Sequence, residues 1–323
     1  MKNRPARFVG IDVSKAHRDL AYRPEHTRWR VANDSAGIAQ GLAHLRPLKP
    51  SLIVLEATGG WQDALVAALA VAQLPVAVVN PRQRRDVAKA TGPLAKTDAL
   101  DAGVIAHVAE AVHPTPRPLP DALTQQLDAL VQRQCQRREI LVTERHRMAL
   151  THPTVRDSLA RPIDDLQRLI DETDAEISTL IRTTPAWREA DDVRQSTPGI
   201  GPVLSATLQA ALPELGVLNQ RELAKLVGVA PLNDDSGQRS GARHIRGGRA
   251  EVRAVLSMAT LTATRCNPVI NAFYHRLLAR GKAQKVAMTA AMRKFLPILN
   301  AMVKTRTPWN ARVNPSPLPE PSR

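Results

Sequence analysis

The feature that most constrains the fold is a pair of short apolar runs separated by an apolar helical stretch. The runs are "SLIVLEAT" (51–58) and "PVAVVNP" (75–81), and "GWQDALVAALAVAQ" (60–73) lies between them. Short apolar runs with little polar alternation are typical of strands buried on both faces. A helix between two such strands provides the crossover that a parallel pair requires. The chain is therefore expected to contain an α/β domain.

The segments around these runs complete the order of elements. Three strand-type segments in a meander come first, a helical segment follows them, and two helical segments come after the second run. They are 7–15, 19–23 and 27–34 for the strands, and 36–48, 81–92 and 96–112 for the helices. This is the element order of an RNase H-like fold, a mixed sheet with helices on both faces. We expect this domain over residues 1–115.

The rest of the chain is predicted to be mostly helical. "PTPRPLP" (114–120) is proline-dense and predicts an extended linker. Apolar residues at helical spacing continue to about residue 184, with a polar interruption near 151–158. This pattern predicts a helical hairpin or coiled-coil arm, although a plain helical bundle has the same periodicity. We assign 116–189 to linker and arm, 190–308 to a helical domain and 309–323 to a disordered Pro/Ser-rich tail.

The cysteines and the apolar segments bear on where the protein works. Cys135 and Cys266 lack a metal-type spacing and make no disulfide framework, which favours a reducing cytosol. The first residues lack the apolar core of a signal peptide. The longest apolar run, 64–72, is too short to cross a bilayer. We expect a soluble cytoplasmic protein.

The net charge of +15 is concentrated in the last quarter of the chain. Residues 237–323 hold 16 Lys and Arg residues but only two acids, Glu251 and Glu320. Such a concentration favours a polyanionic partner, because each neutralised phosphate releases counterions. A basic surface that only aids solubility is the alternative. An anionic membrane fits less well, because no large aromatic or Leu-rich amphipathic face is present.

Four carboxylates form the first candidate site. Asp12 lies in the first strand, Glu56 ends a buried strand, and Asp98 and Asp101 lie three residues apart on one face of a helix. Each alone has a structural explanation, such as a helix cap or a salt bridge. Together, at one edge of a sheet, they would repel one another unless a cation neutralised them. Hard divalent ions such as Mg²⁺ prefer oxygen ligands, and one or two of them could act on a phosphodiester.

Two glycine-rich segments form the second candidate site. "STPGIGPVLSATLQAAL" (196–212) has the Gly-x-Gly pattern of a helix-hairpin-helix, whose glycines Gly199 and Gly201 let backbone N–H groups approach a DNA phosphate. "PLNDDSGQRSGARHIRGGR" (231–249) places Ser236 behind two aspartates. The arginines of this loop could hold phosphate oxygens; they are Arg239, Arg243, Arg246 and Arg249. The chemistry alone leaves Ser236 equally well explained as a nucleophile or as a loop residue of a DNA-binding patch.

Beyond these patterns, the chain resembles the insertion-sequence one-ten family of transposases, which has a one-eleven-eleven branch and includes the pilin-gene invertase Piv. The resemblance covers most of the chain and rests on motifs that occur in family order. They are "GIDVSK", "LEATGG", "NPRQRRDVAKATGPLAKTDALDA", "TPGIGPV", "LVGVAPLNDDSG" and "HIRGGRAEVR".

The resemblance implies a RuvC-like N-terminal domain with a D-E-D-D metal site, which falls on Asp12, Glu56, Asp98 and Asp101. It also implies a C-terminal transposase domain whose nucleophilic serine precedes a glycine, which falls on Ser236. Ser240 also precedes a glycine but lies later in the pattern. The family resemblance further implies a Mg²⁺ cofactor and a composite site made by two subunits of a homo-oligomer, a dimer or a tetramer of paired dimers. The partners it implies are DNA and a guide (bridge) RNA encoded by the element.

From this we expect a DNA transposase or recombinase in which Ser236 attacks a DNA phosphodiester with metal assistance, at the bacterial nucleoid. A structure-specific nuclease, in which water attacks instead, is the first alternative. An invertase acting on one chromosomal locus is the second, and a non-catalytic nucleic-acid-binding protein is the third. The last of these predicts that replacement of Asp12 leaves function intact.

Overall fold

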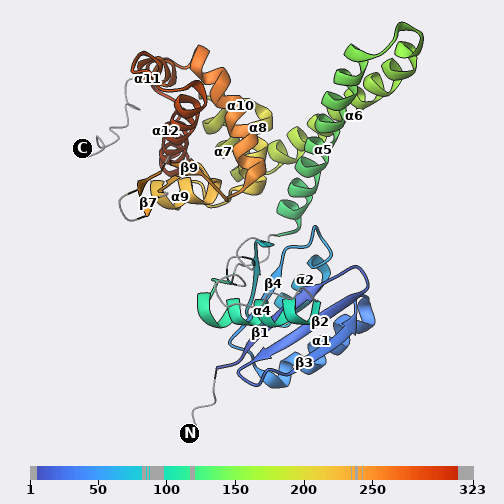
Figure 1. The fold of residues 1–323 in the computed structure, drawn as a ribbon. Helices are drawn as coiled ribbons and strands as arrows, with labels where there is room; N and C mark the ends of the chain where they lie inside the picture. Colours follow the sequence, from blue (N-terminus) through green and yellow to red (C-terminus); the bar gives the residue numbers. More distant parts are fainter. Residues whose placement is uncertain are drawn as a thin grey trace. The chain divides into compact units, whose positions relative to one another are not determined.

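The computed structural model describes residues 6–81, 85, 87, 98–116, 121–233, 235–236, 239–241 and 243–311 (Figure 1). The chain divides into two compact units, residues 1–120 and 121–323. The first unit is α/β, and the second consists mainly of helices.

A five-stranded mixed sheet with the order β3-β2-β1-β4-β5 forms the centre of the first unit. Its strands are β1 (Phe8–Val13), β2 (His17–Arg23), β3 (Arg28–Ala32), β4 (Leu52–Glu56) and β5 (Val76–Val79). β1, β2 and β3 form an antiparallel meander, whereas β4 runs parallel to β1 and β5 runs parallel to β4. The RNase H-like α/β architecture expected from the sequence is confirmed.

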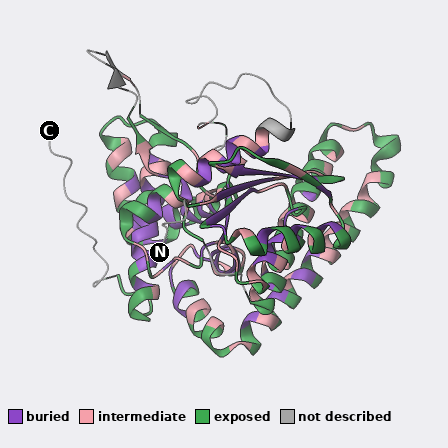
Figure 2. Ribbon diagram, turned by 90° about the horizontal axis from the view of Figure 1, so that it is seen from below, coloured by how far each residue is buried: buried purple, intermediate pink, exposed green. Residues whose placement is uncertain are grey.

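Helices cover both faces of this sheet, whose strands are largely buried (Figure 2). On one face, α1 (Ser35–Leu48) and α2 (Asp63–Val71) contribute Leu45, Leu65 and Leu69 to an apolar core with alternate strand residues. On the other face, α4 (Asp98–Val112) contributes Ile105, Val108 and Ala109. The helix expected over 81–92 lies largely outside the described residues.

The path of α4 across the sheet is fixed by Gly10 in β1. A Cβ atom at Gly10 would lie 2.3 Å from the Ala102 carbonyl oxygen and 2.1 Å from the Ala106 amide nitrogen, so only glycine permits this approach. Two residues earlier, the Phe8 ring meets the His113 ring edge-on, just beyond the end of α4. α4 therefore runs antiparallel to β1, and its first turn lies toward the end of β1 that carries Asp12.

In the second unit, α5 (Ala122–Leu150) and α6 (Arg156–Thr183) form the expected helical hairpin, joined through a 3₁₀ turn at Pro153–Val155 (Figure 1). α5 begins at Asp121, whose carboxylate caps the Thr124 amide. Apolar residues of the two helices meet near its base, and a polar layer follows in which Asp174 accepts hydrogen bonds from Gln134 and Arg138.

The described part of the second unit contains six further helices. They are α7 (Pro185–Gln195), α8 (Pro202–Ala211), α9 (Gln220–Val227), α10 (Ala250–Cys266), α11 (Pro268–Ala279) and α12 (Gln284–Thr305). They share one apolar core, in which Phe295 and Leu299 of α12 are fully buried. In the described residues, α12 is the one helix long and apolar enough to span a membrane, and half of its most apolar stretch is buried within the protein.

Two details differ from the sequence expectation. The segment after α9, which the sequence analysis treats as a loop, contains four two-residue strands: β6 (Pro231–Leu232), β7 (Asp235–Ser236), β8 (Arg239–Ser240) and β9 (His244–Ile245). β6 pairs with β9, and β7 pairs with β8. Trp309, assigned to the tail, packs against the core and donates its backbone N–H to the Ser196 hydroxyl.

Candidate active site

The sheet aligns three carboxylates in one row. Ile11 of β1 lies beside Leu55 of β4, so Asp12 and Glu56, the next residue of each parallel strand, occupy the same level. On the other side of β1, Asp12 lies directly opposite Asp19 of β2. Neighbours across a sheet project to the same face. The three carboxylates therefore share one face of the sheet.

This is the face that α4 covers. Phe8 and Gly10 alternate with Asp12 along β1, and both contact α4 or the residue just after it. Because the first turn of α4 lies toward Asp12, the helix brings Asp101 to this end of the sheet. Asp101 is partly exposed, and the side chain of Asp98 lies outside the described residues.

A turn fixed by Gln62 follows Glu56. The Gln62 side-chain oxygen accepts hydrogen bonds from the Thr58 amide, the Thr58 hydroxyl and the Gly60 amide. Gly60 has a φ of 106°, which only glycine adopts readily. Burial raises the pKa of the neighbouring Asp63 above its ordinary value, although the Gln62 amide donates a hydrogen bond to it. The turn thereby sets where β4 ends and where the buried Glu56 carboxylate lies.

Asp19, which the sequence pattern did not single out, is already paired. Arg30 of β3 lies opposite it in register, and its Nε and Nη2 donate to the two Asp19 oxygens at 2.8 and 3.0 Å. Asp19 is buried, and a buried carboxylate requires such a partner. The sequence signal for a buried acid was an aspartate within the strand segment "HRDLAYR". Only the strand register, however, shows that Asp19 lies next to Asp12.

The donor chemistry fits a hard divalent cation in part. Asp12 and Glu56 offer carboxylate oxygens, the ligand type that such ions prefer, at one level of one face, and Asp101 lies on the helix that covers this face. Among the residues that the structure describes, however, no three His, Cys, Asp or Glu side chains gather closely enough to hold a metal ion. The D-E-D-D set therefore remains a prediction that includes Asp98.

Ser236 lies in the second unit, in the small ribbon between α9 and α10. In the β7–β8 pair, Ser236 lies opposite Arg239, and Asp235 lies opposite Ser240. The side chains of these four residues are outside the described part, but the backbone pairing places the serine next to an arginine. Further along the ribbon, Arg243 and Arg246 are exposed.

The base of this ribbon is held by Arg249. Its guanidinium forms a bidentate ion pair with Glu214, at 2.6 and 2.7 Å, and also donates to the Ala211 carbonyl. Arg249 was expected to bind phosphate, but in this structure its guanidinium is committed to partners within the protein. No local pattern connects it to Glu214, which lies 35 residues earlier.

A second set of contacts closes the base. Arg253 donates to the carbonyls of Val227 and Gly247 at 3.1 and 2.6 Å. The backbones of Gly228 and Gly248 cross so closely that a Cβ atom on Gly248 would lie 2.3 Å from the Gly228 nitrogen. Both glycines have positive φ, at 78° and 70°. The ribbon therefore leaves the helical core at a fixed point.

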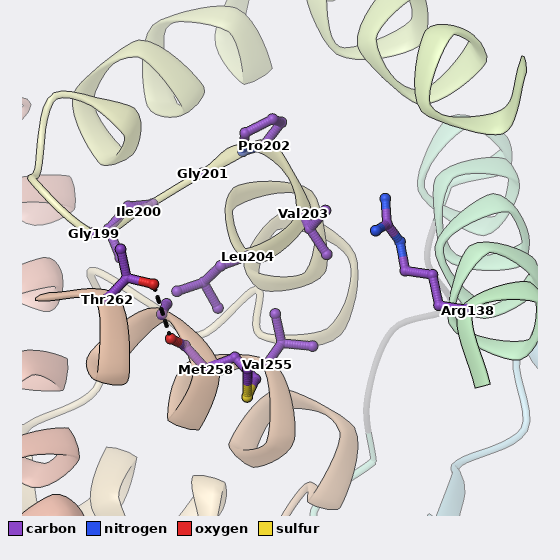
Figure 3. Close-up of a pocket in the computed structure, with 11 residues that line it drawn as sticks. Arg138, Gly199, Ile200, Gly201, Pro202, Val203, Leu204, Val255, Met258 and Thr262 are labelled. Carbon is purple, nitrogen blue, oxygen red and sulfur yellow. Dashed lines mark hydrogen bonds between the residues drawn. The ribbon is translucent and has the colours of Figure 1, made fainter. Parts of the chain in front are cut away.

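The two helices expected on either side of the Gly-x-Gly turn are present, and their role as a DNA-contacting helix-hairpin-helix stays a prediction. α7 ends at Gln195, Gly199 has a φ of 101°, and α8 begins after Gly201 without a side-chain cap. A Cβ atom on Gly199 would lie 2.7 Å from that of Ala263, whereas Gly201 faces open space. The hairpin borders an open hollow of about 520 Å³, toward which Arg138 of α5 points (Figure 3). Val255, Met258 and Thr262 of α10 form its floor.

Charge is concentrated on the last three helices. Lys294 is buried, and burial followed by the nearby Arg276 lowers its pKa. Both cations contact the Phe273 ring, with the Lys294 ammonium 5.2 Å and the Arg276 guanidinium 5.4 Å from its centre. From 252 to 311 the chain has no acidic residue. This segment can therefore attract a polyanion.

Comparison with known proteins gives a consistent result along the chain. Residues 9–151 match a family described as a DEDD transposase, and residues 192–275 match the transposase IS116/IS110/IS902 family. The chain is 27% identical to the pilin gene-inverting protein of Moraxella bovis over 322 residues, covering 95% of this chain and 98% of that protein. The corresponding Moraxella lacunata protein gives the same figures.

Two further similarities are partial. An uncharacterized 42 kDa protein of insertion element IS900 from Mycobacterium paratuberculosis is 32% identical over 155 residues, covering 47% of this chain and 38% of that protein. A solved structure of T. thermophilus RuvC in complex with a Holliday junction substrate aligns with a TM-score of 0.29 and 18% identity. That alignment covers 36% of this chain and 100% of the RuvC chain.

Proposed function

Because the chain belongs to the IS110 family of transposases, a family of DNA-processing enzymes, we propose that it is a serine recombinase that cuts and rejoins DNA. The observation that carries this proposal is the in-register row of Asp12 and Glu56 on the α4 face, within the part that matches the DEDD transposases. Ser236 lies within the second matched part, on a ribbon rich in arginine.

The first chemical step would be a transesterification. The Ser236 hydroxyl oxygen forms a bond to phosphorus, while the bond from phosphorus to a deoxyribose oxygen breaks. The hydroxyl proton passes to Asp234 or Asp235 and finally to the leaving oxygen. The DNA end is then held as a phosphoserine ester, which conserves the energy of the bond for rejoining.

The acids of the first unit would hold Mg²⁺, and the residues that would do so are Asp12, Glu56, Asp98 and Asp101. Bound there, the ion would neutralise charge on the scissile phosphate. Arg239, Arg243 and Arg246 would hold phosphate oxygens, and the helix-hairpin-helix would contact the DNA backbone through Gly199 and Gly201.

The partners and the place of action belong to the same proposal. The protein would act in the cytoplasm at the nucleoid, on element ends and target DNA, with a guide RNA from the element. Two subunits would complete each site, with the acids of one facing the serine of the other. The helical hairpin of α5 and α6 would join them.

A second candidate is a site-specific DNA invertase. The observation that favours it is the match over 95% of this chain to a protein named for inverting a pilin gene. Both candidates use the same serine step and differ in the arrangement of their DNA sites. A substrate that carries two sites in inverted orientation separates them, since an invertase turns the intervening DNA whereas a transposase excises it.

Trapping of the covalent intermediate tests the proposal. The full-length protein is incubated with element-end DNA, RNA transcribed from the element's flanks and Mg²⁺, and the products are run on a denaturing gel. We expect a slowly migrating protein–DNA adduct that is lost in Ser236→Ala and in Asp12→Ala.

Ser240→Ala is the matched control, because Ser240 also precedes a glycine in the same ribbon, and it should keep the adduct. Free nicked DNA that persists in Ser236→Ala would instead mean hydrolysis by water at the acid cluster, as in a structure-specific nuclease. Full activity of Asp12→Ala would exclude any role of the acid row.

A further inference from the structure

The row of carboxylates ends in a cation at the edge of the sheet. Arg30 lies opposite Asp19, and Asp19 lies opposite Asp12, so the row runs from Glu56 through the two aspartates to Arg30. Adjacent strands are about 4.8 Å apart, which places the Arg30 backbone roughly 10 Å from that of Asp12. A DNA strand over Asp12 would therefore have a neighbouring phosphate within reach of this edge.

A second arginine shares that edge and face. The burial of β3 alternates: Trp29 and Val31 pack into the core beneath α1, and Trp29 stacks on His44 with ring centres 4.4 Å apart. Arg28 and Arg30 therefore project to the opposite face, the one that carries the carboxylate row. Both are exposed, because α4 packs mainly on β1, β2 and β4.

The two guanidiniums are held differently. Arg30 fixes Asp19 through Nε and Nη2, and half of its side chain stays exposed. In the described part of the chain, the Arg28 guanidinium makes no hydrogen bond or ion pair. A Cβ atom on Gly103 of α4 would lie 4.0 Å from the Arg28 guanidinium. The absence of a side chain at Gly103 leaves room beside Arg28.

We propose that Arg28 and Arg30 bind the phosphodiester backbone of the DNA strand that is cut at the acid row. The inference rests on the proposed function, since it takes the row to be the place where DNA is processed. Acidic residues repel DNA, and a flanking pair of arginines offsets this repulsion and aligns the strand across the row. Arg30 would also keep Asp19 neutralised, so that Asp19 does not compete with Asp12 and Glu56 for the cation.

The competing explanation is protection of the sheet edge. Edge strands often carry charged side chains that prevent pairing with a second molecule. That explanation predicts aggregation when the arginines are removed, with no change in DNA affinity. The phosphodiester explanation predicts a loss of DNA affinity whose size depends on salt.

The two explanations can be distinguished by the affinity for a labelled single-stranded DNA in the absence of Mg²⁺. Fluorescence anisotropy measures this affinity over a range of salt concentrations. We expect Arg28→Gln to weaken binding about threefold to tenfold at low salt and to lower the salt slope by about 0.7, the value for one phosphate contact on a single strand. Arg30→Lys keeps a charge at the edge and should bind almost as the wild type does. Arg46→Gln on α1, an exposed arginine on the opposite side of the sheet, is the matched control and should change neither quantity.

Equal affinity and slope in Arg28→Gln and Arg46→Gln would overturn the proposal. A loss confined to RNA of the same length would also overturn it, because it would assign the arginines to the guide. The assay contains no chemical step. The proposed function can therefore fail, through absence of the serine adduct, while the loss of DNA binding in Arg28→Gln persists.

Discussion

Gly10 of β1 and Ala106 of α4 touch through their backbones: a Cβ atom at Gly10 would lie 2.1 Å from the Ala106 nitrogen. Gly10→Ala must therefore lift α4 from the sheet. We expect the free energy of unfolding to fall by about 2–3 kcal/mol, as for other overpacked cores. Because α4 carries two of the predicted ligands, the serine adduct should be lost as well. Urea unfolding and the trapping gel measure the two effects.

Gly41→Ala is the control for this substitution. Gly41 lies inside α1, and a Cβ atom there would have no neighbour within 4 Å in the described part of the protein, the helix's own nearby backbone aside. Alanine inside a helix is favoured over glycine by about 0.5–1 kcal/mol. Gly41→Ala should therefore stabilise the protein and keep the adduct, and equal behaviour of the two variants would contradict this account of α4.

The Arg249–Glu214 pair is expected to set the position of the serine ribbon. Glu214→Gln removes the charged partner of a partly buried guanidinium and leaves it two neutral acceptors, the new amide and the Ala211 carbonyl. We expect a loss of about 1–3 kcal/mol in the free energy of unfolding. Hydrogen exchange of the amides from 231 to 246 should rise, because the ribbon's base opens more often.

The charge-reversed protein with Glu214→Arg and Arg249→Glu checks that the pair itself is responsible. It should recover part of the stability that either single reversal loses, and with it the rate of adduct formation. If Glu214→Gln changed neither hydrogen exchange nor adduct formation, Arg249 would be free to serve as the phosphate ligand that the sequence suggested.

Gly199 and Gly201 should separate folding from DNA binding at the hairpin. Gly199→Ala collides with Ala263 at a positive φ, so we expect a loss of at least about 2 kcal/mol in the free energy of unfolding. Gly201→Ala meets open space and should fold normally, yet bind duplex DNA several-fold more weakly because a methyl group keeps the phosphate away. Unchanged DNA binding in a folded Gly201→Ala would exclude the hairpin as a phosphate site.

Tyr22 is expected to limit stability at high pH. Its hydroxyl is buried and has no hydrogen-bond partner among the residues that the structure describes, and burial raises its pKa far above the ordinary value of 10.0. Near pH 10 the unfolded chain loses this proton, whereas the folded protein keeps it. The free energy of unfolding is therefore unaffected by this group below pH 10 and falls as the pH rises above 10.

Tyr22→Phe removes both the unpaired hydroxyl and this titration. It should raise the free energy of unfolding by about 1 kcal/mol at pH 7. The difference from the wild type should grow above pH 10 in urea unfolding series. A constant difference from pH 7 to pH 11 would show that Tyr22 ionises in the folded protein.

Much of the first unit could be predicted because its signals are local. Apolar runs identify β4 and β5, and strands that run parallel end at one edge, so Asp12 and Glu56 could be expected at the same level. The position of Asp19 beside Asp12 could not be predicted, because it depends on the register of β2 against β1. The residue pattern of a single strand does not specify that register. The alternation in "TRWRVAND" predicted a strand, but only the pairing shows that its arginines face the acid row.

In the second unit, the structure around Ser236 was harder to predict from the sequence. Two-residue strands are too short to produce a periodic pattern, so the sequence of this ribbon indicated only a loop. Arg249 resembled its neighbours in sequence, and only its distant partner Glu214 distinguishes it from Arg243 and Arg246. Long-range ion pairs of this kind decide which basic residues remain available to a ligand.

Because the backbones of Gly228 and Gly248 cross closely, the serine ribbon is structurally independent of the helical core. The chain leaves α9 and returns to α10 at this one crossing point. The length of the segment between the two glycines can therefore change without altering how α9 and α10 pack. The stability of the protein is therefore expected to depend on the packing of its helices and not on the length of this ribbon.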